Sequence, residues 1–156
     1  MSSHTSGASL RRRSFILSSD QQKIISAHGP FIESIDVSEW EAHNHRPTEP
    51  PIRVKPFAGA YVDTVLPLGA TGHVVAISNI HQEKPGEDYK VYATLVHAAH
   101  LAIGGYSFRR LRFVINTQPS TEKKPLQPIV NVVPQSNKLL VLTGNSLKVF
   151  EVVFDP

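Results

Sequence analysis

Residues 123–156, KKPLQPIVNVVPQSNKLLVLTGNSLKVFEVVFDP, contain three short apolar runs separated by two turn signals. The first signal is Pro-Gln-Ser-Asn at 134–137 and the second is Gly-Asn at 144–145, and these residue types favour tight turns. Runs of this length between such turns predict antiparallel strands joined as hairpins, here at 128–133, 138–143 and 146–153. In the last strand two sets of side chains alternate between the faces: Leu147, Val149 and Glu151 against Lys148, Phe150 and Val152.

The same order of features occurs twice earlier in the chain, in 61–79 and in 89–116. Each unit begins with a strand and a turn. A nearly all-apolar strand follows, and then a glycine turn and a strand of alternating pattern. Central strands that are almost wholly apolar indicate burial on both faces, as in stacked sheets. The predicted fold class is therefore all-β, with antiparallel hairpins resembling about two to three β-propeller blades; a sandwich is the alternative.

The composition is that of an ordinary globular chain of about one domain. The 156 residues are 40% hydrophobic and 19% charged, which excludes a disordered or fibrous class. There is no cysteine, so disulfides, thiolate nucleophiles and cysteine-ligated zinc are excluded. No apolar run approaches the ~18 residues of a membrane span, so no transmembrane segment is predicted.

Residues 1–22 are expected to form a disordered, basic and serine-rich tail. Up to residue 19 the chain carries three arginines and no acid. A cleavable mitochondrial presequence has the same composition, so mitochondrial import is the alternative localisation. The run Arg11-Arg12-Arg13-Ser14 suits a basophilic kinase, whose acidic pocket pairs with the arginines, and this makes Ser14 a candidate phosphorylation site.

Residues 23–52 are interpreted as a short mixed segment followed by a proline-rich linker. The pattern predicts a helical turn at 24–25 and then a strand at 31–37. A polar loop closed by prolines follows, with Trp40 as a packing anchor at its edge. Regular β-structure is expected to fill 53–156, and this region defines the predicted folded domain.

The densest positive features of that region are a strand with Arg109, Arg110 and Arg112 and a loop with Lys123 and Lys124. One interpretation is an outer strand whose arginine stems cover apolar surface. The other is a contact with an acidic protein, an anionic lipid surface or RNA. The remaining basic excess is diffuse, which disfavours nucleic acid. These five residues are the predicted partner-binding set.

No catalytic, cofactor or metal site is predicted. Histidines occur in pairs at His97 and His100 and at His43 and His45, but zinc needs three or four converging ligands. The strand pattern favours turn histidines that point to different places. No nucleophile elbow, phosphate loop, dinucleotide fingerprint or His-Glu-x-x-His motif occurs, so the sequence predicts a protein that is not an enzyme.

Residues 89–154 resemble the opening blades of a citron-homology (CNH) domain, in the form found in vacuolar and endosomal tethering subunits of the HOPS and CORVET type. LAIGG at 101–105 stands in the place of that family's Val-Gly-Thr-like turn. Lys-Pro-Leu at 124–126 stands in the place of a Lys-Pro-Ile-like entry, and 139–147 in that of the apolar hairpin that follows. Gly144 departs from the family, which often has aspartate at this turn.

The resemblance implies a closed propeller of about seven blades, so the sequence is expected to be the N-terminal part of a longer protein. It implies a non-enzymatic scaffold for vesicle tethering that binds other proteins, among them a small GTPase and other tether subunits. The implied location is cytoplasmic and peripheral on endosomal or vacuolar membranes. The alternative from the residues is an independent small β domain that binds protein or RNA through its arginine-rich strand.

Overall fold

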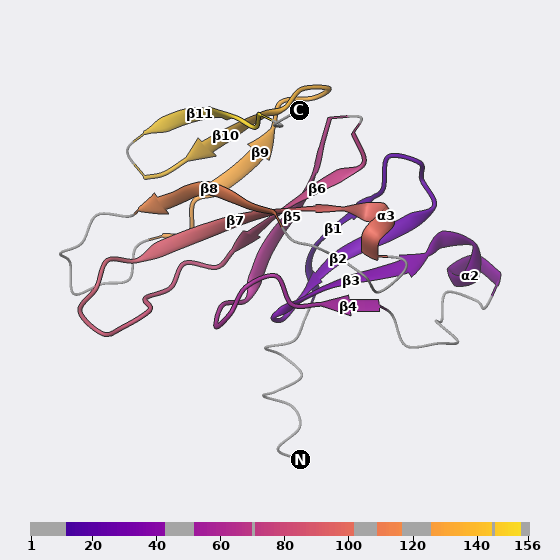
Figure 1. Ribbon diagram of the computed structural model, residues 1–156, viewed down its shortest axis with the longest axis horizontal. Coiled ribbons are helices and arrows are strands. Elements are labelled where there is room, and N and C mark those ends of the chain that lie inside the picture. The colour runs from indigo at the N-terminus through magenta and orange to yellow at the C-terminus, as the bar shows by residue number, and fades with distance from the viewer. Residues whose placement is uncertain are drawn as a thin grey trace, which may run out of the picture.

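The computed structural model describes residues 12–42, 52–69, 71–101, 109–116, 126–144 and 146–153. The backbone alone is described at 12–13, 39–40, 42, 99–100 and 109–116. Within these ranges the fold is all-β, as predicted: eleven strands form three antiparallel sheets, and two short helices lie beside them (Figure 1). In each sheet the strands follow one another in chain order, so the chain builds three successive meanders.

Sheet A consists of the four strands nearest the N-terminus. They are β1 (Arg12–Leu17), β2 (Lys23–His28), β3 (Phe31–Asp36) and β4 (Ile52–Val54), and helix α2 (Val37–Ala42) follows β3. A two-residue turn joins β2 to β3, because His28 pairs with Phe31. Gly29 in this turn has a φ of 61°, a left-handed conformation that glycine adopts without steric cost.

Sheets B and C follow in sequence. Sheet B contains β5 (Val62–Leu68), β6 (His73–Ser78), β7 (Lys90–His97) and β8 (Arg109–Asn116), and helix α3 (Ala98–Leu101) follows β7. Sheet C contains β9 (Ile129–Val132), β10 (Lys138–Leu142) and β11 (Leu147–Glu151). The strands predicted around 73–78, 90–96 and 138–143 are confirmed within a residue.

Sheet B is the middle layer, which explains its nearly all-apolar strands. Side chains on a strand point alternately to its two faces. Along β6, Val74 and Ala76 belong to the core shared with sheet A, whereas Val75 and Ile77 belong to the core shared with sheet C. The prediction of burial on both faces is therefore confirmed for this strand.

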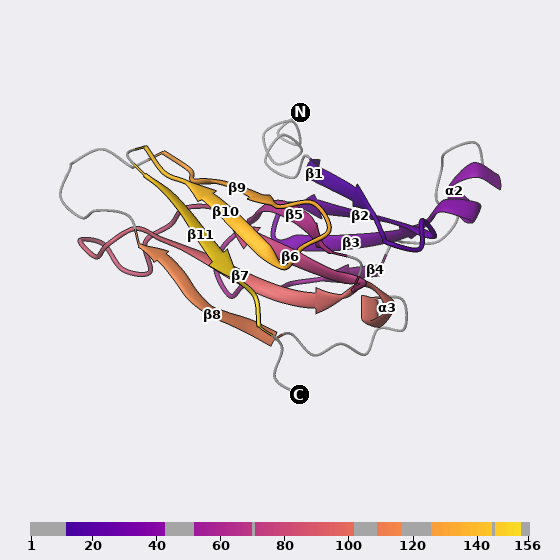
Figure 2. The same cartoon turned by 90° about the horizontal axis from the view of Figure 1, so that it is seen from above.

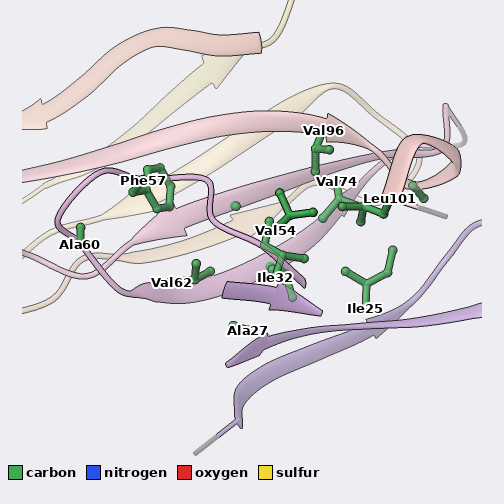
Figure 3. Packing of buried hydrophobic residues seen from close by; sticks show 13 residues of the cluster. Ile25, Ala27, Ile32, Val54, Phe57, Ala60, Val62, Val74, Val96 and Leu101 are labelled. Atoms are coloured by element: carbon green, nitrogen blue, oxygen red, sulfur yellow. The ribbon is translucent and has the colours of Figure 1, made fainter. Parts of the chain in front are cut away.

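Two separate hydrophobic cores hold the layers together. The core between sheets A and B is shown in Figure 3, and its most deeply buried members include Ile25, Ile32, Val62 and Leu101. The core between sheets B and C includes Leu68, Ile77, Val91 and Leu139. Each buried aliphatic side chain of this size contributes about 1.5–3 kcal/mol relative to exposure, so both interfaces are required for the stack.

Neighbouring sheets meet along their first strands. β5 contacts β1 and β2 on one side and β9 on the other. Figure 1 shows the three sheets side by side, and in Figure 2 sheet C lies over sheet B. Consecutive antiparallel meanders packed face to face, with adjacent first strands, are the arrangement of successive propeller blades around a common axis.

Polar side chains also join the layers. The Ser14 hydroxyl donates to the Val65 carbonyl oxygen (3.3 Å) and accepts from the Val65 N–H (3.2 Å), linking β1 to β5. Gln127, just before β9, donates through Nε2 to the Ser78 carbonyl (3.0 Å), and its Oε1 accepts from the Ile80 N–H (2.6 Å). Ser14 thus satisfies two backbone groups of the edge strand β5, and Gln127 satisfies two at the end of β6.

The strand expected at 31–37 is confirmed as β3, but the prediction of a disordered tail was wrong from residue 12 onward. Residues 12–22, assigned to a disordered tail, form β1 and a turn, and the helical turn expected at 24–25 lies within β2. The expected polar loop begins as helix α2, while the rest of it, like residues 1–11, lies outside the described residues. The strands β1 and β2 were missed because polar residues such as Ser14, Ser26 and His28 interrupt their apolar pattern.

The proposed threefold repeat also needs correction. The units at 61–79 and 89–116 are the two halves of sheet B, because β6 pairs with β7 in register from His73–His97 to Ile77–Ala93. The charged stretch between them is the connection of one hairpin, which a bridge between His81 and Lys90 begins to close. Only the third unit, in 123–156, forms a sheet of its own.

The turn between β1 and β2 allows a direct test of local electrostatics. The Ser18 hydroxyl donates to Asp20 Oδ1 (2.5 Å), and the Gln22 N–H donates to the same oxygen (3.0 Å). These bonds favour the ionised carboxyl and hold the pKa of Asp20 below its usual value, with the Ser18 bond as the main cause.

We expect Ser18→Ala to raise the pKa of Asp20 toward its usual value. Because the folded-state pKa is lowered, the turn's contribution is present above the unfolded pKa and is lost as pH falls through the folded pKa. An NMR titration of the Asp20 carboxyl, with Ser19→Ala as the neighbouring control, measures the shift. A wild-type pKa that Ser18→Ala leaves unchanged would contradict the assigned cause.

Candidate protein-interaction surfaces

The predicted arginine strand is β8, the outer strand of sheet B. Arg109 and Arg110 lie opposite Leu95 and Thr94 of β7, and Arg112 lies in the same strand. No described strand pairs with the other edge of β8. The side chains of these arginines, and Lys123 and Lys124 as a whole, lie outside the described residues, so their role in partner binding stays a prediction.

The histidines do not form a metal site in the described part of the chain. His97 ends β7, and its ring packs edge-on against that of His73 with centroids 4.8 Å apart. The backbone of His100 lies in α3, whereas His43 and His45 lie outside the described ranges. Among the described residues, no group of three His, Asp or Glu side chains is placed to hold a metal ion.

Gly72 is fixed by the same pair of rings. It precedes His73 with a φ of 78°, and a Cβ atom added there would lie 2.9 Å from Nε2 of His97. Both the backbone conformation and the close approach of the ring require glycine at this position. The histidine pair is therefore part of the packing at the β6–β7 end of sheet B.

The outer face of sheet C carries a continuous apolar surface, which we call the C-face patch. It is formed by Ile129, Leu140, Leu142, Leu147 and Val149. Leu142 lies directly opposite both Ile129 and Leu147, and Leu140 lies opposite Val149. Four of the five are exposed, from 47% for Leu142 to 63% for Leu147. A contiguous aliphatic surface of this kind is typical of an interaction face.

The outer face of sheet A carries a buried charge cluster instead. Glu33 is 0% exposed, and its Oε1 lies 2.7 Å from Nε of Arg53 and 2.7 Å from Nδ1 of His28. The Arg53 guanidinium also lies over the ring of Phe31, 5.8 Å from its centroid. Arg53 therefore neutralises Glu33 through a charge-assisted hydrogen bond.

Apolar side chains flank this cluster on the same face. Phe15 lies opposite Ser26, which in turn lies opposite Glu33. Phe15 is 74% exposed and Leu17 is 52% exposed. Ser26 is buried together with Glu33, so neither group is open to a substrate, and the cluster acts as a structural tie within an otherwise accessible face.

Sequence reasoning found part of these surfaces. The alternation in β11 placed Leu147 and Val149 on one face, and the structure confirms this, since Val152 is buried on the opposite side. The cluster of His28, Glu33 and Arg53 was missed. The local signal for this cluster is the Gly29-Pro30 turn. A hairpin at this turn brings His28 close to Glu33.

Comparison of the chain with protein-family models, with curated proteins and with solved structures gave no match. In the part of the chain that the structure describes, no helix is long and apolar enough to cross a membrane.

Proposed function

We propose that this chain is a non-enzymatic, propeller-type scaffold segment of vesicle-tethering machinery that binds other proteins. The observation that carries the proposal is the stack of three successive antiparallel meanders with adjacent first strands. Propellers present rigid faces and rims to partners. The resemblance of 89–154 to the opening blades of a CNH domain supplies the trafficking context.

The C-face patch supports a stack that continues beyond sheet C. Sheet C is apolar on its inner face, where Leu139 and Val141 are buried, and also on its outer face, where Leu142 and Val149 are exposed. Sheets that are apolar on both faces are middle layers. In the proposed scaffold another antiparallel sheet covers this patch, as sheet C covers sheet B.

Arg109, Arg110, Arg112, Lys123 and Lys124 form the proposed partner-binding set. The three arginines lie in β8, the outer strand of the middle layer, and the two lysines follow β8 in the sequence. Basic residues at a rim steer an acidic partner and set the rate of its association. The proposed partners are a small GTPase and other tether subunits on endosomal or vacuolar membranes, whose anionic lipids add a peripheral attraction.

Binding of the full chain to purified endosomal and vacuolar GTPases, loaded with GTP or GDP, tests this proposal. We expect Arg109→Gln, Arg110→Gln and Arg112→Gln together to weaken binding by about tenfold, as expected for a few rim charges. The control removes three exposed lysines elsewhere, by Lys55→Gln, Lys84→Gln and Lys148→Gln, and should leave binding unchanged.

Two results would overturn the proposal. One is the absence of binding to any GTPase or tether subunit. The other is tight RNA binding that weakens steeply with salt, the signature of phosphate contacts, which would favour an independent RNA-binding β domain.

A further inference from the structure

β1 is an edge strand of sheet A, and its outer side chains are exposed. It pairs only with β2, and its register slips between Arg12 and Ser14. Phe15 and Leu17 point to the outer face and are exposed, whereas Ile16 alone packs against the core between sheets A and B. An edge strand whose described side chains are mostly exposed or half-buried opens locally at a lower free energy than the whole fold.

Ser14 is the polar tie that holds this strand against sheet B. Its hydroxyl bonds to both the N–H and the carbonyl of Val65, at 3.2 and 3.3 Å. In an extended strand these two groups of one residue point to the same side, so both face the edge of β5 that β1 covers. Val65 itself is only 1% exposed, and solvent has little access to either group while β1 is in place.

The sequence before Ser14 is Arg11-Arg12-Arg13, which suits the acidic pocket of a basophilic kinase. A kinase binds its substrate segment as an extended, separate chain, and the Ser14 hydroxyl is engaged in the closed sheet. We propose that Ser14 is phosphorylated only when β1 leaves sheet A, and that the phosphate then prevents β1 from returning. This inference rests on the β1–β5 contact and is independent of the proposed scaffold function.

The chemistry of phosphorylation explains why β1 cannot return to sheet A. Ser14 Oγ attacks the γ-phosphorus of ATP, the Oγ–P bond forms, and the bond from that phosphorus to the bridging oxygen of ADP breaks. The hydroxyl proton passes to the carboxylate base of the kinase. The product can no longer donate to the Val65 carbonyl, and it carries about −1.5 to −2 charge at neutral pH. Returning that charge to a half-buried site beside Val65 is strongly unfavourable.

The test compares the full chain with a peptide of residues 8–20. Both are incubated with ATP and the catalytic subunit of cyclic-AMP-dependent protein kinase, and phosphate on Ser14 is followed by mass spectrometry. The intact chain should react at least about tenfold more slowly than the peptide, because only the opened fraction is a substrate. Ile16→Ala loosens β1. It should raise the rate of Ser14 phosphorylation in the full chain relative to that of a peptide with the same substitution. Leu17→Ala, an exposed neighbour, is the matched control and should not.

Hydrogen exchange of the phosphorylated chain provides the second readout. Amides of β1 and the β2 amides bonded to it should lose protection, while those of β10 in sheet C keep theirs. The inference is overturned if the intact chain reacts at the peptide rate. It is equally overturned if neither the intact chain nor its Ile16→Ala variant reacts, if the peptide is not a substrate, or if β1 stays protected after phosphorylation.

Discussion

Leu139→Ala is expected to lower the free energy of unfolding by about 2–5 kcal/mol, the usual cost of truncating a fully buried leucine. Leu139 is 0% exposed and lies in the middle strand of sheet C, opposite Val132 and Phe150. It belongs to the core that joins this sheet to sheet B. Its truncation removes apolar contacts and leaves a cavity between two rigid layers.

Leu142→Ala is the matched control on the same strand. Leu142 lies in the C-face patch and is 47% exposed, so its truncation should cost no more than about 1 kcal/mol. Urea denaturation of the two variants measures the difference. Equal losses of stability would mean that the two faces of sheet C are not buried as described.

The experiment also separates local from global loosening. Sheet C contacts the rest of the fold mainly through its inner face and through β9 against β5. Hydrogen exchange in Leu139→Ala should therefore rise first in β10 and β11, before it rises in β2 or β6. Uniform loss of protection would indicate that the three sheets unfold as one unit.

The fold class was predictable because its signal is local. Apolar alternation and the turn residues at 134–137 and 144–145 placed β9, β10 and β11, and the apolar run in β6 indicated a middle layer. The pairing between strands was less predictable, because a series of hairpins in the sequence does not show which strands belong to the same sheet. The joining of 61–79 to 89–116 in sheet B depends on the His73–His97 register, for which the sequence has no marker.

The N-terminal sheet was missed for a different physical reason. Ser26 is a polar residue that tertiary structure buries in β2, so the apolar pattern did not identify this strand, and the strand predicted at 31–37 was left without its partner. Arg53, twenty positions later, reaches Glu33 across β3 and β4 and supplies a counter-charge for it. Such compensation between distant residues is visible in the structure and has no periodic signature in the sequence.

Arg53→Ala is expected to be the second strongly destabilising change, by about 2–4 kcal/mol, because it leaves a buried carboxylate without its main counter-charge. Glu33 is 0% exposed, and the Arg53 Nε lies 2.7 Å from its Oε1. Arg53 itself is half-exposed, so the cost arises on the carboxylate that cannot reach water. The second partner, His28 at 2.7 Å, offsets part of this loss.

The comparison with Glu33→Gln separates the charge from the packing. Glutamine keeps the shape of Glu33 but removes its charge. The variant that combines Arg53→Ala with Glu33→Gln should therefore lose less free energy of unfolding than the two single variants lose in sum, by a coupling of about 1–3 kcal/mol. Asp36→Ala is the control within the same sheet: it breaks the Lys23–Asp36 pair at 3.5 Å, whose carboxylate is 45% exposed. An exposed pair contributes at most about 1 kcal/mol. If Arg53→Ala costs no more than Asp36→Ala, Glu33 is hydrated or neutral in the folded protein, and the outer face of sheet A is held by its apolar contacts alone.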